Sequence, residues 1–217
     1  MRVVNGLMKS LVCFLLLACF SGVGYAGQIE KPISSECLDC HDIAPGEIGG
    51  DYDKAITGSV HSGLECLDCH TAIIELPNEE NLPAVYCGEC HEEEANTYQW
   101  HGRLRVPNGE DVPVCADCHG KHDIRPSTDQ RSRVHPINLP ETCGRCHEDL
   151  DLIKKHEIYV QKPIEIYESS VHGKASLGGI YVAATCNDCH SVGGTAHRIL
   201  SPGDPESPIN HFNVPHT

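Results

Sequence analysis

The chain has 217 residues, a formal net charge of −15, 14 cysteines, 15 histidines, one tryptophan and three phenylalanines. The acidic balance argues against nucleic acid or an anionic membrane surface as a partner, and it favours basic partners. Large apolar residues are too few for an ordinary core at this length, and the cysteine content indicates a disulfide scaffold or metal or cofactor binding.

Residues 1–26 have the pattern of a cleaved secretion signal. Arg2 and Lys9 supply the positive charge, Leu11 to Phe20 form an apolar stretch, and Ala26 ends a small-residue cleavage site. The apolar stretch is short for a membrane span. The alternative is a lipobox at residues 16–19, in which Cys19 would be lipidated. We therefore expect a periplasmic protein or, alternatively, one that is lipid-anchored or lies on the outer cell surface.

The remaining twelve cysteines all fall in six copies of C-x-x-C-H, which we number in chain order. The motifs are Cys37/Cys40/His41 (motif 1), Cys66/Cys69/His70 (motif 2), Cys87/Cys90/His91 (motif 3), Cys115/Cys118/His119 (motif 4), Cys143/Cys146/His147 (motif 5) and Cys186/Cys189/His190 (motif 6). No mature cysteine is left over for a structural disulfide.

The motif predicts covalent attachment of haem c. Two thiols on one helical turn can each add to one vinyl group of a porphyrin, and the adjacent histidine can then bind the iron. A zinc ribbon also uses C-x-x-C, but a histidine directly after the second cysteine is not a zinc-finger spacing. A disulfide framework needs no histidine at all. We therefore expect six haems, with the six motif histidines as proximal ligands.

The second axial ligand of each iron is expected to be histidine. Both methionines of the chain, Met1 and Met8, lie in the signal segment, and nine histidines remain outside the motifs. Ligation by two histidines favours low reduction potentials. Position selects six distal candidates, which are His61, His101, His122, His156, His172 and His197. The other three, His135, His211 and His216, are interpreted as bystanders.

The motifs alternate between two kinds, so the chain reads as two-haem repeats. Motifs 2, 4 and 6 are C-x-D-C-H, and motifs 3 and 5 are C-G-x-C-H preceded by Asn-Leu-Pro; motif 1 begins the series with a further C-x-D-C-H. His101 and His172 each lie 14 residues before a C-x-D-C-H motif, and this fixed offset supports a ligand role. Residues 122–142 and 197–217 match at a constant shift of 75. The shift would place a seventh motif directly after Thr217, and we expect the natural reading frame or a linked gene to supply it.

Regular structure is expected to be sparse, because proline and glycine are scattered through every spacer. Short helices are predicted at Glu92 to Trp100 and at Glu148 to Tyr159, and short helical turns are predicted at the motifs. No segment shows the alternation of a strand series. The expected domain plan is a signal peptide at 1–26 and one hexahaem domain at 27–217.

From about Glu36 to the end, the chain resembles multihaem c-type cytochromes of anaerobic respiratory bacteria, of the cytochrome c3/c7-like kind with paired C-x-x-C-H motifs. The resemblance implies a fold that is mostly irregular with short α-helices, wrapped around a haem array with little or no β-sheet. It also implies close haem packing and electron transfer along the row. The haems would supply the apolar faces that the polypeptide lacks, so folding would depend on their attachment.

The expected function is electron transfer in anaerobic respiration, without enzyme activity. The partners would be other redox proteins, namely an inner-membrane quinol-oxidising cytochrome and a terminal reductase or outer-membrane conduit. The alternative is a multihaem reductase of nitrite, hydroxylamine or a sulfur oxyanion, which requires one haem with an open face. A subunit of a haem filament is a third hypothesis.

Overall fold

The computed structural model describes residues 34–41, 52–78, 81–98, 101, 111–158, 160 and 162–214. Residues from Lys31 to Thr217 form one compact unit. The predicted signal peptide and the alternative lipidation site at Cys19 lie outside the described residues, as does His216.

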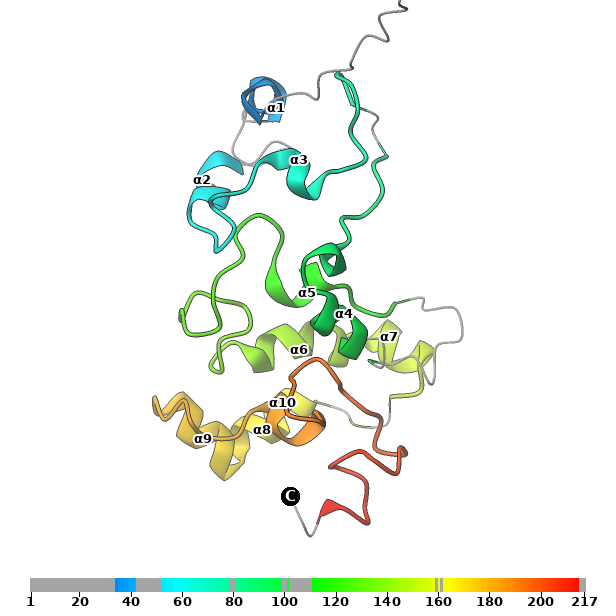
Figure 1. Cartoon of the computed structure of the whole chain (residues 1–217). Helices are drawn as coiled ribbons and strands as arrows, with labels where there is room; N and C mark the ends of the chain where they lie inside the picture. The colour runs from blue at the N-terminus through cyan, green and yellow to red at the C-terminus, as the bar shows by residue number, and fades with distance from the viewer. Residues whose placement is uncertain are drawn as a thin grey trace, which may run out of the picture. The chain divides into compact units, whose positions relative to one another are not determined.

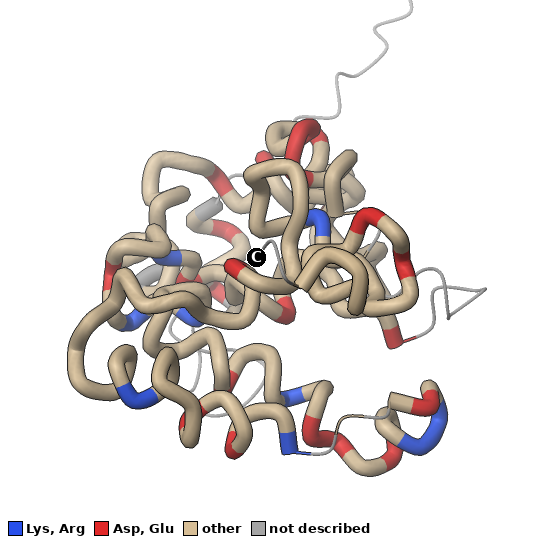
Figure 2. Tube along the Cα trace, turned by 90° about the horizontal axis from the view of Figure 1, so that it is seen from below, with Lys and Arg blue, Asp and Glu red and all other residues tan. Residues whose placement is uncertain are grey.

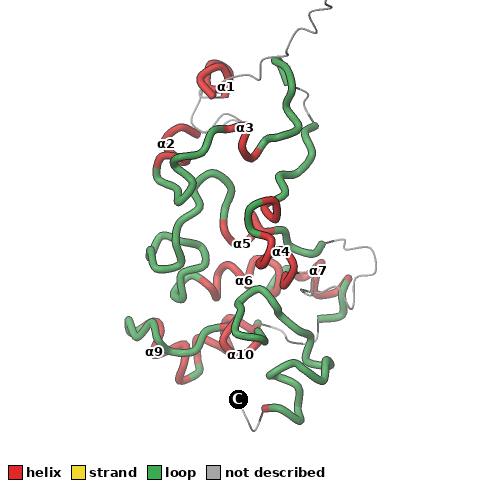
Figure 3. Tube along the Cα trace, in the orientation of Figure 1, coloured by secondary structure: helices red, strands yellow, loops and turns green. Residues whose placement is uncertain are grey.

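Short helices connected by irregular chain make up the described part, as Figure 1 shows. The elements are α1 (Ser34–His41), α2 (Tyr52–Thr57), α3 (Cys66–Cys69), the 3-10 turn η1 (Cys87–Glu89), α4 (Glu92–Tyr98), α5 (Cys115–His119), α6 (Leu139–His147), α7 (Leu150–Lys155), α8 (Pro163–Ser169), α9 (Val171–Leu177) and α10 (Cys186–His190). No strand occurs among the described residues (Figure 3), where one isolated bridge joins Ser191 and Ile199. The expected fold class, irregular with short α-helices, is therefore confirmed.

Each motif lies in or at a short helical turn, as predicted. The two helices predicted after the C-G-x-C-H motifs are also present, as α4 and α7. The second helix begins later than expected, because Asp149 caps it by accepting hydrogen bonds from the backbone of Asp151 and Leu152 at 2.9 and 3.0 Å. It ends early, because Glu157 adopts a left-handed conformation with φ of 50°.

The aspartate of the C-x-D-C-H motifs has a structural role at the start of the helical turn. In motifs 2, 4 and 6 its side chain accepts a hydrogen bond from the backbone N–H of the residue just before the motif, at 2.8, 2.7 and 2.6 Å. This bond ties the start of the turn to its third residue, as in half of a capping box. The aspartate of these motifs therefore stabilises the first turn of a helix that has few other stabilising contacts.

The glycine of C-G-x-C-H serves close packing instead. Gly88 and Gly144 are both buried. A Cβ at Gly88 would lie 2.8 Å from the Cβ of Ala95 in α4, and a Cβ at Gly144 would lie 2.9 Å from Cγ1 of Ile164 in α8. The glycine lets a later helix, α4 at motif 3 and α8 at motif 5, approach the motif backbone.

Apolar packing among the described residues is thin. Leu200 is the one large apolar side chain among them that is buried, at 3% exposure. Many others are exposed, including Val171, Val182 and Leu150 at 77%, 95% and 79%. A polypeptide with so little buried apolar surface lacks the main favourable contribution to folding.

The two segments related by the shift of 75 are built alike. In the first segment, the Asn138 side-chain amide donates to the carbonyls of Gln130 and Ser132 at 2.7 and 2.8 Å. The Ser132 hydroxyl donates to the carbonyl of Arg125 at 3.1 Å. This bonded loop leads directly into α6 and motif 5.

The second segment repeats these bonds. The Asn213 amide donates to the carbonyls of Pro205 and Ser207 at 2.8 and 2.9 Å, and the Ser207 hydroxyl donates to Leu200 at 3.5 Å. Ser207 is fully buried. The repeat seen in the sequence is thus also a repeat of the hydrogen-bonded structure.

Acidic positions outnumber basic ones along the described trace, as Figure 2 shows, in line with the net charge of −15. No helix in the described ranges is long and apolar enough to cross a bilayer.

Candidate haem-binding site

The motif cysteines are available for thioether chemistry. All eleven whose side chains the structure describes are free thiols, namely Cys37, Cys66, Cys69, Cys87, Cys90, Cys115, Cys118, Cys143, Cys146, Cys186 and Cys189. Cys40 belongs to α1, but its side chain lies outside the described residues.

Four motif histidines face a histidine from elsewhere in the chain. The ring centroids are separated by 5.9 Å for His61 and His91, 6.1 Å for His70 and His122, 6.5 Å for His101 and His147, and 6.0 Å for His119 and His197. Each pair therefore combines one motif histidine with one of the six distal candidates.

This separation matches the dimensions of an iron atom between two imidazoles. A histidine nitrogen binds a metal at about 2 Å and lies about 1.1 Å from the centre of its ring, so two axial imidazoles should have centroids about 6 Å apart. The four centroid separations are thus compatible with one iron between the two rings of each pair.

The described residues hold no cluster of three or more histidine, cysteine or acidic side chains suited to a metal ion. Pairs are the arrangement that a haem requires, because the porphyrin supplies four of six ligands and leaves two axial positions for protein.

Burial favours the neutral imidazole, the form that binds metal, in His70, His101, His119, His122 and His147. Burial, reinforced by His147 and His190, lowers the pKa of His101 to about 4. Burial is also the main cause of the lowered pKa of the other affected histidines, which are His70, His119, His122, His147 and His190.

Neighbouring motifs meet through their first cysteines within the pairs 1–2, 3–4 and 5–6. Burial raises the pKa of Cys37, and so do the charge of Cys66 and a hydrogen bond to it. Cys87 has the same relationship to Cys115. In the third pair the Cys143 thiol donates a hydrogen bond to Cys186, which raises the pKa of Cys143.

Between these pairs the second cysteines interact. Burial raises the pKa of Cys69, and Asp68 and the motif 3 thiol Cys90 raise it further. In the same way the pKa of Cys118 is raised by burial, by Asp117 and by Cys146 of motif 5. Each motif therefore has a cysteine near enough to a cysteine of the next motif in chain order to affect its pKa.

The remaining histidines have other surroundings. His156 Nε2 lies 2.8 Å from Asp111 Oδ2, which Lys155 also contacts at 2.6 Å. His172 is exposed at the start of α9, and among the described residues no ring contact or ion pair involves it. The rings of His135 and Tyr181 lie 5.1 Å apart, edge to face.

The pairing follows the motif kind, which the sequence analysis did not use. His61 and His101 face the histidines of C-G-x-C-H motifs, namely His91 and His147. Although His101 lies 14 residues before Cys115, its partner is thus in motif 5. The motif kind groups these two pairs, but the sequence alone does not say which motif each histidine faces.

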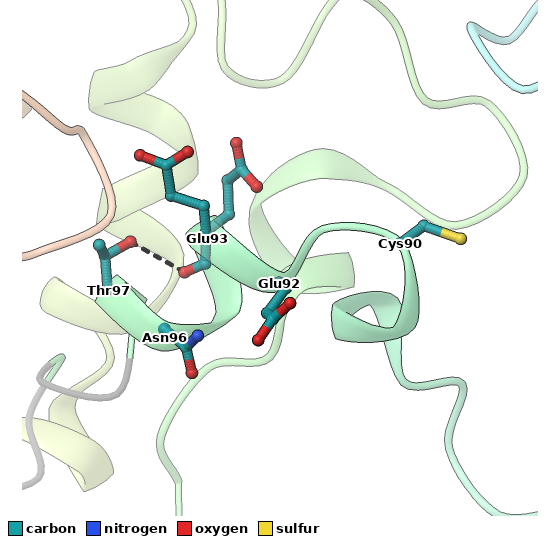
Figure 4. Close-up of a pocket in the computed structure, with 6 residues that line it drawn as sticks. Cys90, Glu92, Glu93, Asn96 and Thr97 are labelled. Carbon is teal, nitrogen blue, oxygen red and sulfur yellow. Dashed lines mark hydrogen bonds between the residues drawn. The ribbon is translucent and has the colours of Figure 1, made fainter.

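An open hollow lies beside motif 3. It is lined by Cys90 and by side chains of α4, namely Glu92, Glu93, Glu94, Asn96 and Thr97 (Figure 4). The Thr97 hydroxyl donates to the Glu94 carbonyl at 2.9 Å. Three acidic side chains therefore line the same hollow as the exposed motif thiol of Cys90.

Comparison with known proteins finds similarity to polyheme cytochromes. In an alignment of 168 positions that covers 68% of its length, the chain is 25% identical to the C-type polyheme cytochrome OmcB of two strains of Geobacter sulfurreducens. The matched region covers 22% of each relative, so the chain spans less than a quarter of their length. No family model matches, and no solved structure matches.

This distant similarity supports a multihaem c-type cytochrome. It agrees with the free thiols and the four histidine pairs, which were observed independently of any relative. The similarity also suggests a role in electron transfer rather than catalysis.

Proposed function

We propose that the chain transfers electrons through six covalently bound c-type haems, most of them ligated by two histidines. The observation that carries the proposal is the set of four histidine pairs with centroids 5.9–6.5 Å apart. A haem whose two axial positions are filled by protein has no open site for a substrate. The bound iron would supply one-electron chemistry, and the chain would hold it low-spin and at low potential.

The six proximal histidines and twelve motif cysteines would hold the haems, with His61, His101, His122 and His197 as distal ligands of motifs 3, 5, 2 and 4. His156 and His172 stay as distal candidates without an observed motif partner. The unbroken series of neighbouring motifs supports transfer from motif 1 to motif 6, because each attachment site adjoins the next.

The setting is part of the proposal. A cleaved signal at residues 1–26 would deliver the chain to the periplasm, where a role in anaerobic respiration fits low-potential haems. The partners would be a quinol-oxidising cytochrome and a terminal reductase or outer-membrane conduit. A net charge of −15 favours partners with basic docking surfaces, because complementary charge steers association.

The test is to produce the chain with the cytochrome c maturation machinery and to measure haem number, spin state and potential together. Mass spectrometry should show six haem additions, ferric electron paramagnetic resonance (EPR) should show mainly low-spin haem, and a redox titration should fall mainly below the standard hydrogen potential. Four or fewer haems would reject the proposed cofactor content, and mainly high-spin haem would reject the ligation.

The reductase alternative has one observation in its favour. No imidazole ring lies against His190 in the described part of the chain, although His190 interacts electrostatically with His147. A haem at motif 6 with an open distal side could bind a small anion. Titration with cyanide or nitrite decides between the two functions, because a stoichiometric spectral change in one haem would favour the reductase.

A further inference from the structure

The distal histidines follow a pairing rule that leaves one of them without a motif partner among the described residues. His61 and His101 each precede a C-x-D-C-H motif, and each faces the histidine of a C-G-x-C-H motif further along the chain. His172 is the third histidine of this kind, since it precedes motif 6. Both C-G-x-C-H motifs of the chain, with His91 and His147, are already matched.

A second pairing rule concerns the histidines that follow C-x-D-C-H motifs, and it leaves His190 of motif 6 without a distal ligand among the described residues. His122 and His197 follow motifs 4 and 6 closely, and each faces the proximal histidine of the preceding C-x-D-C-H motif, His70 or His119. The corresponding ligand for His190 would come from one further C-x-D-C-H unit. A single additional two-haem unit would therefore satisfy both His172 and His190.

The backbone around His172 is held firmly although its side chain is exposed. The Ser170 hydroxyl caps α9 by accepting a hydrogen bond from the Gly173 N–H at 3.1 Å. Gly173 is buried, and a Cβ there would collide with the carbonyl oxygen of Tyr167. The histidine is thus presented from a fixed turn, which lowers the cost of ordering it on binding.

The segment after motif 6 has the same hydrogen-bonded structure as the loop that leads into motif 5. Its hydrogen bonds from Asn213 and Ser207 repeat those from Asn138 and Ser132, which build the loop that leads into motif 5. Motif 5 is a C-G-x-C-H motif, the kind that His172 requires.

From these three observations we infer that His172 is the distal ligand of a c-type haem that is not one of the six in residues 1–217. This haem belongs to a further unit of the same two-haem repeat. The inference rests on the proposed function. Binding is a ligand exchange, in which the neutral imidazole nitrogen replaces water on ferric iron and the water leaves. Neither the oxidation state nor the proton count changes.

The test uses the holoprotein and a haem peptide, which is an N-acetylated C-x-x-C-H peptide with one covalent haem and its own histidine as the only axial protein ligand. Adding the holoprotein should convert the peptide haem from high to low spin. Half-conversion should need at least tenfold less holoprotein than free imidazole. His172→Ala should remove this advantage, whereas His211→Ala, at another exposed histidine, should keep it.

Sedimentation of the holoprotein alone separates two sources of the haem. Self-association that His172→Ala abolishes would identify a second copy as the source, and a monomer that binds the haem peptide would identify a different unit. The inference is overturned if the holoprotein binds no better than imidazole, or if His172→Ala turns one of the six internal haems high-spin. Neither result depends on the haem count, which tests the proposed function separately.

Discussion

The rings of His119 and His197 lie 6.0 Å apart and within 25° of parallel, although 78 residues separate them in the chain. His119 belongs to motif 4, and His197 follows motif 6. Two imidazoles in this relation could bind one iron from opposite sides, so under the proposed ligation one haem would link two distant parts of the chain.

Replacing His197 should open that haem. His197→Ala is expected to convert about one of six ferric haems to high spin, because no second imidazole then fills the axial position. Covalent attachment should be unaffected, since Cys115 and Cys118 remain. EPR measures the spin state, and mass spectrometry the attachment.

His211→Ala is the matched control for this change. His211 is exposed and lies against Phe212 instead of a motif histidine. A high-spin signal of equal size in both variants would contradict the assignment of His197.

His101→Ala should affect the haem of motif 5, because His101 faces His147 at 6.5 Å. In a chain that lacks this haem through Cys143→Ser and Cys146→Ser, the same substitution should add no further high-spin signal.

The comparison background is Cys115→Ser with Cys118→Ser, which removes the haem of motif 4. In this background His101→Ala should still produce one high-spin haem, at motif 5. The opposite pattern would mean that His101 serves the motif 14 residues after it in the sequence.

The low-spin state of the motif 5 haem should survive mild acid. The pKa of His101 is lowered to about 4, chiefly by burial, whereas in an unfolded chain it is about 6.5. Above pH 6.5 both forms are neutral. As the pH falls from 6.5 to 4 only the unfolded chain takes up the proton, so folding loses up to about 3 kcal/mol across this window.

Iron ligation competes with the same proton and so lowers the protonation range further. We therefore expect the low-spin fraction to be unchanged at pH 5 and to fall only near pH 4 or below. Spin-state titration from pH 8 to 3 measures this fraction. Loss of one low-spin haem near pH 6.5 that is absent in His101→Ala would contradict the prediction.

Gly144→Ala should destabilise the holoprotein by about 1–3 kcal/mol, because the new Cβ would lie 2.9 Å from Ile164 Cγ1 in a buried contact. Denaturant unfolding followed by haem absorbance measures the change. In an Ile164→Ala background, which lacks the Cγ1 and Cδ1 atoms that the new Cβ would meet, Gly144→Ala should destabilise less.

Gly63→Ala is the control for this effect, since no atom lies within 4 Å of its added Cβ. It should change the free energy of unfolding by no more than about 0.5 kcal/mol. Equal destabilisation by both substitutions would show that close packing at Gly144 is not the cause.

The sequence by itself determined the haem-binding motifs, the shortage of core residues and the helical, strand-poor fold class. Attachment chemistry needs two cysteines and a histidine within one turn, so contiguous letters such as Cys115 to His119 suffice to recognise it. The repeat at a shift of 75 was also readable, because Asn138 and Asn213 keep the same local hydrogen bonds.

Only the tertiary structure decided which distal histidine faces which motif. The facing residues are between 30 and 78 positions apart, as His61 and His91 and then His119 and His197 show. No local propensity or spacing encodes such a contact, because it depends on how several irregular segments pack together. The offset of 14 residues before Cys115 selected His101 as a distal-ligand candidate. Its position opposite His147 depends on tertiary packing.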